Sequence, residues 1–110
     1  MKKVLMTLLV ITAVTSVVSS GMAKSDFTVS WKEIAQIDTG GGAWDVTISG
    51  NYAYVCDSLD DTPGGLVIID ISDPISPIKM SNFFDGGKPQ EVTVRDNIAY
   101  VADFTDGLEI

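Results

Sequence analysis

The chain has 110 residues, with seven basic against fifteen acidic side chains and a formal net charge of −8 at pH 7. Such an acidic chain does not suit nucleic acid or an anionic membrane surface as its main partner, because both are negatively charged. It has no histidine and one cysteine, which excludes a Ser-His-Asp triad, an HExxH zinc site and an internal disulfide within these residues.

Residues 1–23 have the pattern of a cleavable secretory signal. The start is positive, residues 4–18 carry no charge, and residues 19–23 (SSGMA) offer small side chains for cleavage after Ala23. A retained membrane anchor is the alternative, but a helix over the uncharged run spans only about 22 Å of a ~30 Å hydrocarbon core. We therefore expect a secreted, cell-surface or periplasmic protein that begins at Lys24 and has no stable membrane span. Without the two signal lysines its net charge is −10.

Residues 40–57 and 86–103 are copies of one another. They align without a gap at an offset of 46 residues, and nine of the eighteen positions are identical. The match resumes at 65–68 (GLVI) and 107–110 (GLEI). Repetition at this period predicts a stacked array in which each unit buries apolar surface against its neighbours. The predicted organisation is a signal at 1–23, an N-terminal segment at 24–39, a first repeat at 40–85 and an incomplete second repeat at 86–110.

Each repeat reads as short antiparallel strands without helical periodicity. In the first repeat we expect strands at 45–49, 52–57, 66–71 and 78–84, with a loop fixed by two prolines between the last two. The third strand is apolar on both faces, so it requires partners on both faces. A four-stranded sheet packed between copies of itself meets this need, and its length is that of one propeller blade. The predicted fold class is all-β, with β-propeller blades of four antiparallel strands.

The sequence of the third strand also resembles a known family. Leu66-Val67-Ile68-Ile69-Asp70 is one substitution from the LVIVD repeat signature, and residues 51–55 and 70–74 follow the same pattern. Residues 36–110 therefore resemble the LVIVD repeat family. The resemblance implies secreted or cell-surface β-propeller proteins of bacteria and archaea, mostly without an assigned activity. It brings no catalytic residues with it.

Two features concern the ends of the repeated region. Residues 36–41 echo residues 82–87, so the N-terminal segment is expected to hold a lone outer strand that closes the propeller ring. The chain stops inside the third strand of its second repeat, so fewer than two complete blades are present. A propeller needs about four to eight blades. We therefore expect an N-terminal fragment of a longer protein.

Cys56 occupies the position of Ala102 in the second copy, Tyr-Val-Cys-Asp against Tyr-Val-Ala-Asp. The equivalence predicts a slot for a small buried side chain. No Lys, Arg or His adjoins Cys56 in the sequence to lower its pKa. We therefore interpret Cys56 as a small hydrophobe and not as a reactive thiol.

Antiparallel alternation places the loops before the first strand and between the second and third strands on one face. The residues on this face that are candidates for an interaction site are Trp44, Asp45, Gln90 and Glu91. Trp44 could stack on a sugar or on an apolar side chain of a partner, or close the gap beside the N-terminal strand. Functional insertions in repeat proteins concentrate on the loops of one face.

Carboxylates on the same face raise the alternative of a Ca²⁺ site at Asp57, Asp60 and Asp61. The spacing lacks the ligand pattern of an EF-hand loop. Capping of loop amides at the strand ends is the preferred interpretation of Asp57 and Asp103, and turn capping that of Asp70. We therefore expect no cofactor, with calcium as the alternative.

The predicted function is a non-enzymatic interaction module that binds a protein or glycan. The alternative is an extracytoplasmic propeller enzyme whose active site lies in missing downstream blades. Asp45 and Glu91 could flank the central channel of such an enzyme. Similar residues at equivalent positions more often reflect repeat architecture, because an active site breaks the symmetry.

Overall fold

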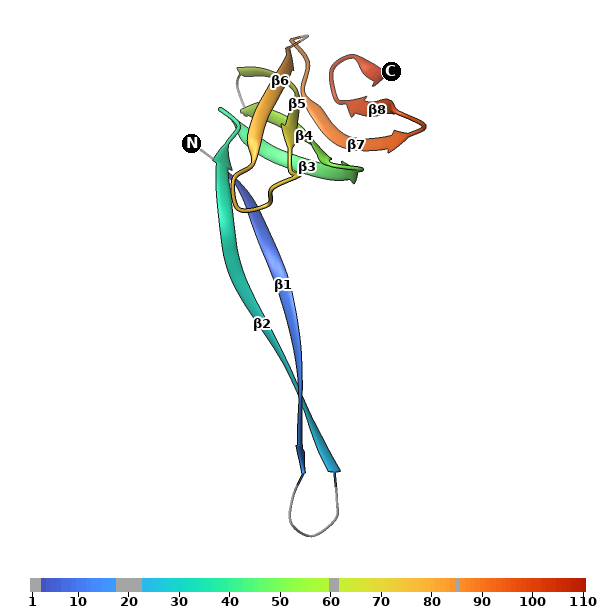
Figure 1. Cartoon of the computed structure of the whole chain (residues 1–110). Coiled ribbons are helices and arrows are strands. Elements are labelled where there is room, and N and C mark those ends of the chain that lie inside the picture. Colours follow the sequence, from blue (N-terminus) through green and yellow to red (C-terminus); the bar gives the residue numbers. More distant parts are fainter. Residues whose placement is uncertain (1–2, 18–22, 60–61, 85) are drawn as a thin grey trace.

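The computed structural model of the chain describes residues 3–17, 23–59, 62–84 and 86–110, and within these ranges it is built of antiparallel β-strands (Figure 1). No helix in these ranges is long and apolar enough to cross a membrane. The predicted all-β class is confirmed.

The first repeat is a four-stranded antiparallel sheet in the order β3-β4-β5-β6. Its strands are β3 (Gly42–Ser49), β4 (Tyr52–Leu59), β5 (Thr62–Asp70) and β6 (Ile78–Phe84). All four predicted strands are confirmed. The double-proline loop follows β5. It begins with the predicted turn cap, in which the Ser72 amide donates to Asp70 Oδ1 at 2.8 Å.

The second repeat forms a separate three-stranded antiparallel sheet in the order β7-β8-β9. Its strands are β7 (Pro89–Arg95), β8 (Ile98–Asp103) and β9 (Gly107–Glu109). The β7–β8 turn has positive φ at Asp96 (51°) and Asn97 (63°), which these residue types tolerate in tight hairpins. The sequence copy at an offset of 46 is therefore also a structural copy, with first, second and third strands in the same order.

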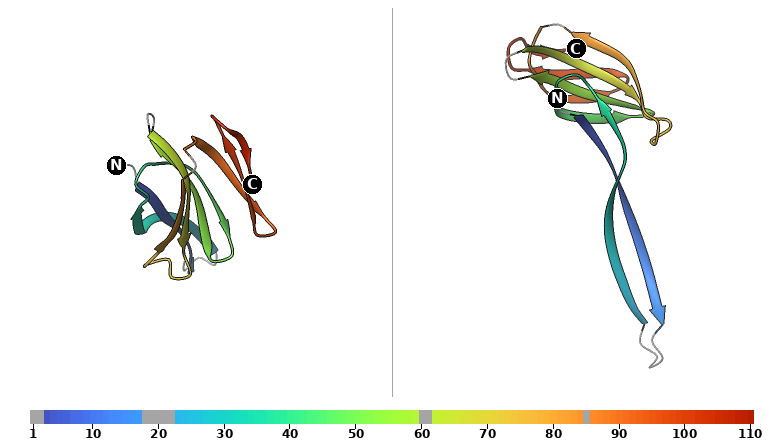
Figure 2. Two further views of the ribbon diagram at one scale, coloured as in Figure 1. Left: turned by 90° about the horizontal axis from the view of Figure 1, so that it is seen from above. Right: turned by 90° about the vertical axis from the view of Figure 1, so that its left-hand side faces the viewer.

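Two apolar clusters form the core, one on each face of the first sheet. Ala53, Val55, Val67 and Ile69 make the first cluster, with partly buried Ile37 and Ile71 packed against it. The second cluster lies between the repeats and contains Cys56, Val92 and Val101, with Tyr54, Leu66 and Ala99 around them. Figure 2 shows the two sheets side by side. The predicted division of β4, with Tyr54 and Cys56 facing one way and Ala53 and Val55 the other, is confirmed.

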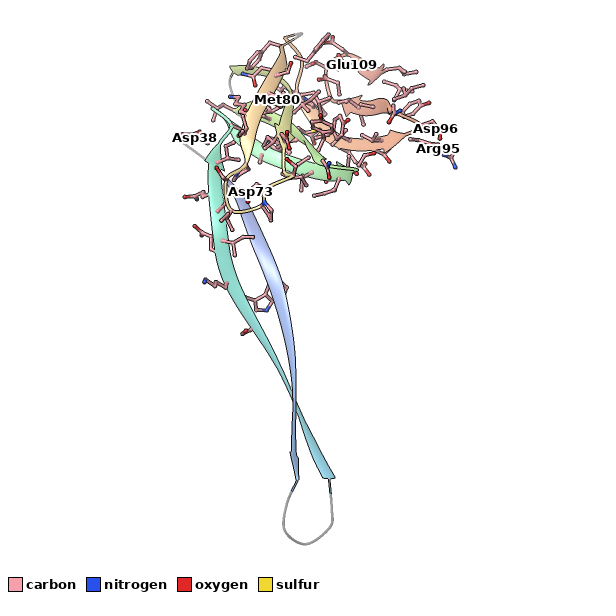
Figure 3. All side chains as sticks on the ribbon, viewed as in Figure 1. Asp38, Asp73, Met80, Arg95, Asp96 and Glu109 are labelled. Atoms are coloured by element: carbon pink, nitrogen blue, oxygen red, sulfur yellow. The ribbon has the colours of Figure 1, made fainter. Side chains whose placement is uncertain are left out.

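The N-terminal part forms a long antiparallel ribbon of β1 (Lys3–Val17) and β2 (Ala23–Asp38), which projects away from the two repeats (Figure 1). β1 covers most of the run that the sequence predicts to be a cleavable signal. Asp38 lies where the ribbon joins the first repeat (Figure 3). The Lys79 ammonium on β6 donates to the Thr39 carbonyl at 2.9 Å and fixes this junction. β2 supplies the strand expected in the N-terminal segment, and its ring-closing role stays a prediction.

Candidate functional site

The predicted interaction face includes two equivalent irregularities, one in the first strand of each repeat, β3 and β7. The β3–β4 register shifts between Ala43 and Asp45, and the β7–β8 register shifts between Pro89 and Glu91. Trp44 and Gln90 are therefore the extra residues at these shifts. A bulge of this kind bends the strand and redirects the side chain at the shift.

Trp44 forms one wall of a shallow pocket. Its ring is 47 % exposed, and its Nε1 donates to the Ser58 carbonyl at 3.2 Å, which fixes the ring orientation. Phe104, 78 % exposed, follows β8 and lines the same pocket. The pocket has a volume of about 220 Å³ and is lined by Trp44, Ser58, Leu59, Lys88, Gln90 and Phe104. We call it the Trp44 pocket. It joins residues of both repeats and combines two aromatic side chains and a leucine with three polar or charged residues.

Asp45 connects the two repeats. Its Oδ2 accepts a hydrogen bond from the Val92 amide on β7 at 2.8 Å, across 47 residues of sequence. Its sequence equivalent Glu91 is exposed. The structure therefore gives Asp45, predicted as part of the interaction face, a role in joining adjacent sheets.

The buried carboxylates of Asp57 and Asp103 occupy equivalent positions at the ends of β4 and β8. Asp57 lies against Gly41, and Asp103 lies against Gly87, so closely that a Cβ on either glycine would overlap the carboxylate. Each carboxylate thereby seals the turn that leads into the first strand of its own repeat. The requirement for glycine comes from this close approach.

The hydrogen bonds of Asp103 confirm the predicted capping role. Its Oδ1 accepts from the Thr105 amide at 2.7 Å, the Thr105 hydroxyl at 2.6 Å and the Asp106 amide at 3.0 Å. Burial raises the pKa of this carboxyl, but hydrogen bonds from Thr105 and from the Lys88 and Asp106 amides outweigh burial. The net result is a pKa below the ordinary value of 3.8.

Asp57 has the opposite shift. Burial raises its pKa above 3.8, and the Thr39 hydroxyl, the Gly41 amide and the positive charge of Lys79 oppose this rise without cancelling it. The difference follows from the loops after the two strands, since the short second-repeat loop folds its own amides back onto Asp103.

The calcium alternative stays a prediction, because two of its three carboxylates are not described by the structure. Asp57 is turned onto Gly41, and Asp60 and Asp61 lie outside the described residues. A different acidic group, Asp103, Asp106 and Glu109, brings one oxygen from each residue within 4.8 Å of the others. Glu109 lies on β9, away from the β7–β8 turn (Figure 3). Asp103 in this group already accepts hydrogen bonds from Thr105 and Asp106 through Oδ1, whereas its Oδ2 is buried and accepts none from the described residues.

Cys56 lies between the repeats and is completely buried. Burial raises the pKa of its thiol from 9.0 to about 12, and the negative charges of surrounding carboxylates add to the effect: Asp45, Asp103, Glu91 and Glu109. The predicted placement in a small buried slot is confirmed. A thiol that is so rarely ionised is a poor nucleophile at neutral pH.

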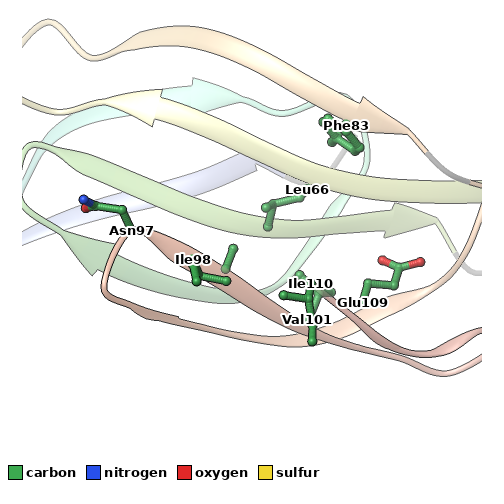
Figure 4. Close-up of a pocket in the computed structure, with 8 residues that line it drawn as sticks. Leu66, Phe83, Asn97, Ile98, Val101, Glu109 and Ile110 are labelled. Carbon is green, nitrogen blue, oxygen red and sulfur yellow. The ribbon is translucent and has the colours of Figure 1, made fainter.

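A larger apolar groove lies between β5 and β6 of the first repeat and β8 and β9 of the second (Figure 4). Its volume is about 480 Å³, and its walls include Leu66, Phe83, Ile98 and Val101. The groove continues the buried cluster that surrounds Cys56, so it is the open margin of the junction between repeats.

Sequence reasoning missed two contributors to the Trp44 pocket, Leu59 and Phe104. Both are exposed apolar residues, Leu59 at the end of β4 and Phe104 directly after β8. The available signal was the loop position of Phe104, directly after Asp103 on the face already singled out. Its proximity to Trp44 depends on how the two sheets stack.

The LVIVD repeat family matches residues 40–85 and 86–110, and these are the two sheets described above. The chain therefore belongs to the LVIVD repeat family, as its sequence suggested. The repeats are propeller-like blades built of antiparallel strands. No curated protein and no solved structure matches the chain.

Proposed function

We propose that this LVIVD repeat protein is an exported, non-enzymatic interaction module that binds a protein or glycan at the Trp44 pocket. The observation that carries the proposal is the Trp44 side chain, which is 47 % exposed and is anchored through Nε1 to the Ser58 carbonyl. An aromatic ring held in one orientation offers large contact area at a small entropic cost.

The residues around the Trp44 pocket favour a role in binding and not in catalysis. Asp45, Asp57 and Asp103 are engaged in joining strands and turns. Glu91 and Gln90 are exposed beside the pocket and can hydrogen-bond a hydroxyl or amide group. The chain contains no histidine, which removes the most common general base. These features favour recognition of a neutral polar or apolar surface.

Binding is tested by probing the chain with an array of immobilised glycans and, separately, with extracellular proteins of the producing cell. The variant is Trp44→Ala. The matched control is Trp31→Ala, which removes another exposed tryptophan from β2, 68 % exposed and far from the pocket. We expect Trp44→Ala to abolish binding and Trp31→Ala to preserve it. Equal loss in both variants, or binding unaffected by Trp44→Ala, would contradict the assignment.

Export is tested independently. The signal pattern of residues 1–23 leads us to expect an exported protein whose N-terminal sequence begins at Lys24. A mature protein that retains residues 4–18 would contradict export by cleavage and favour an anchor. Removal of β1 would also leave β2 without its strand partner.

A further inference from the structure

The two bulges of the repeats bring an aromatic ring and an amide into one pocket. Trp44 and Gln90 are equivalent residues, and each is the extra residue at the register shift of its strand. A bulge redirects its side chain out of the regular alternation of the strand. Both side chains line the Trp44 pocket. The pocket therefore combines a flat apolar surface with a group that both donates and accepts hydrogen bonds.

The composition of the pocket is not repeated along the chain. Nine of the eighteen aligned positions are identical in the two repeats, but the aligned pocket residues are not among them. The equivalent pairs that differ are Gly42 and Lys88, Trp44 and Gln90, and, directly after the aligned segment, Ser58 and Phe104. Identical residues serve the architecture common to both repeats, as Asp57 and Asp103 do at their turns. The differences favour a pocket with a role of its own.

Hydrogen bonds to the backbone fix the two aromatic residues of the pocket. Trp44 Nε1 donates to the Ser58 carbonyl at 3.2 Å. The Phe104 amide donates to the Lys88 carbonyl at 3.0 Å, which holds the backbone of the second repeat's loop beside the start of β7. A contact surface that is ordered before binding loses little conformational entropy on binding.

The size and lining of the pocket suit one sugar ring of a larger ligand. Its volume of about 220 Å³ lies below the roughly 300–1,000 Å³ of pockets for drug-sized ligands. Ser58, Lys88 and Gln90 are polar or charged. An apolar side chain of a protein partner would cover these groups without hydrogen-bonding them, which is unfavourable. A ring with C–H groups on its face and hydroxyls at its edge matches both kinds of lining.

The charge of the surroundings disfavours an anionic sugar. Lys88 lines the pocket, and the exposed Glu91 follows Gln90 directly, so one positive and one negative side chain belong to the same region. The chain as a whole has a net charge of −8, which repels anions at longer range. A neutral sugar avoids this repulsion.

We propose that the Trp44 pocket binds one neutral sugar ring with equatorial hydroxyls, within a chain of β-linked glucose or N-acetylglucosamine. Equatorial hydroxyls leave the C–H groups on the faces of the ring, and such a face packs flat on the Trp44 indole. The Gln90 amide hydrogen-bonds two neighbouring hydroxyls at the ring edge. The inference rests on the proposed function, because it names the ligand class of the same pocket.

The test is isothermal titration calorimetry of the full chain with cello-oligosaccharides and chito-oligosaccharides. The comparison probe is a β-linked manno-oligosaccharide of the same length, which differs from the cello series in its axial hydroxyl at C2. This hydroxyl obstructs one ring face and changes the hydroxyl pair at the ring edge. We expect the manno-oligosaccharide to bind about tenfold more weakly than the cello-oligosaccharide.

The informative variant is Gln90→Leu, which keeps the size of the side chain and removes its hydrogen bonds. The matched control is Gln36→Leu, the same change at an exposed position of β2 that does not line the pocket. Gln90→Leu should bind the cello- and chito-oligosaccharides about tenfold more weakly and lose the preference over the manno series. Gln36→Leu should bind as the wild type does. Equal urea midpoints would show that both variants are folded.

A second pair of variants tests the stacking contact. Trp44→Phe keeps an aromatic ring but removes the Nε1 donor to Ser58, whereas Trp44→Ala removes the ring. Trp44→Phe should therefore retain part of the affinity that Trp44→Ala loses.

Three results would overturn the inference: no binding of either series at millimolar concentration, equally tight binding of the manno series, or equal affinities of Gln90→Leu and Gln36→Leu. Binding of an extracellular protein that requires Trp44, without binding of these oligosaccharides, would overturn the inference and leave the proposed function standing. Oligosaccharide binding that is unaffected by Trp44→Ala would overturn both.

Discussion

The junction between the repeats predicts that the thiol of Cys56 resists modification in the native protein. Cys56 is fully buried where the second sheet covers the first. The thiolate is the reactive form of cysteine, so the rate depends on the ionised fraction as well as on access. Its pKa, raised by burial and then by neighbouring carboxylates, sets that fraction.

The magnitude follows from the shift. With a pKa of 9.0 about a tenth of the thiol is ionised near pH 8. With a pKa of about 12 the ionised part is about one in ten thousand. The lower ionisation alone slows reaction about a thousandfold. The absence of solvent contact slows it further, because reaction then requires transient opening of the junction.

The assay is the absorbance change on reaction with an aromatic disulfide near neutral pH, with native protein and with protein in denaturant. We expect one thiol equivalent to react promptly in denaturant and at least about a thousandfold more slowly in the native state. Native reaction as fast as in denaturant would refute the packing of the second repeat on the first.

A matched variant separates the effect of burial on the thiol reaction rate from the effect of the position along the strand. In a Cys56→Ala background, Ala102→Cys places a thiol at the equivalent, exposed position of the second repeat. This thiol should react rapidly in the single chain.

Three further predictions concern stability. Asp45→Ala should lower the free energy of unfolding, measured by urea titration, by about 1–3 kcal/mol, because the Val92 amide loses its acceptor. The control Glu91→Ala should have little effect. Equal effects of the two substitutions would contradict the hydrogen bond between the sheets. Because the pKa of Asp103 is lowered in the folded state, its stabilisation is complete above pH 3.8 and is lost as the pH falls through the folded pKa. The difference in unfolding free energy between the wild type and Asp103→Asn should therefore shrink in acid, and a difference that grows there would have the wrong sign. Gly65→Ala should lower the free energy of unfolding by about 1–3 kcal/mol, because the added Cβ would overlap the Phe83 carbonyl on β6. The measurement is thermal unfolding. An unchanged midpoint temperature would show that β6 does not pair with β5 as closely as described.

The fold was predictable to a large extent because its signals are local. Alternation of apolar residues and turn residues at 50–51 and 96–97 define strands in both repeats, and the double-proline loop separates the last two strands of the first repeat. The repeat itself strengthens each assignment, since two segments with one pattern must satisfy the same geometry. Cys56 could be placed for the same reason, from its equivalence to Ala102 and its position on an alternating strand.

The candidate site was less predictable because its residues meet across the junction. Trp44 was singled out from the sequence, but Phe104, which lines the same pocket, comes from the other repeat. Asp45 had the appearance of a surface acid, and its partner amide is 47 residues away. No local pattern encodes such pairings, because they depend on how two sheets are offset when they stack.

The sequence by itself determined the strands, the turns, the repeat and the alternation of faces, because these depend on backbone preferences and on the two-residue period of β-structure. Only the tertiary structure decided which carboxylates join strands, which aromatic residues share a pocket and which face of the first sheet packs against the second repeat. These outcomes depend on the stacking of one sheet against the next, which brings together residues that the chain keeps about one repeat apart.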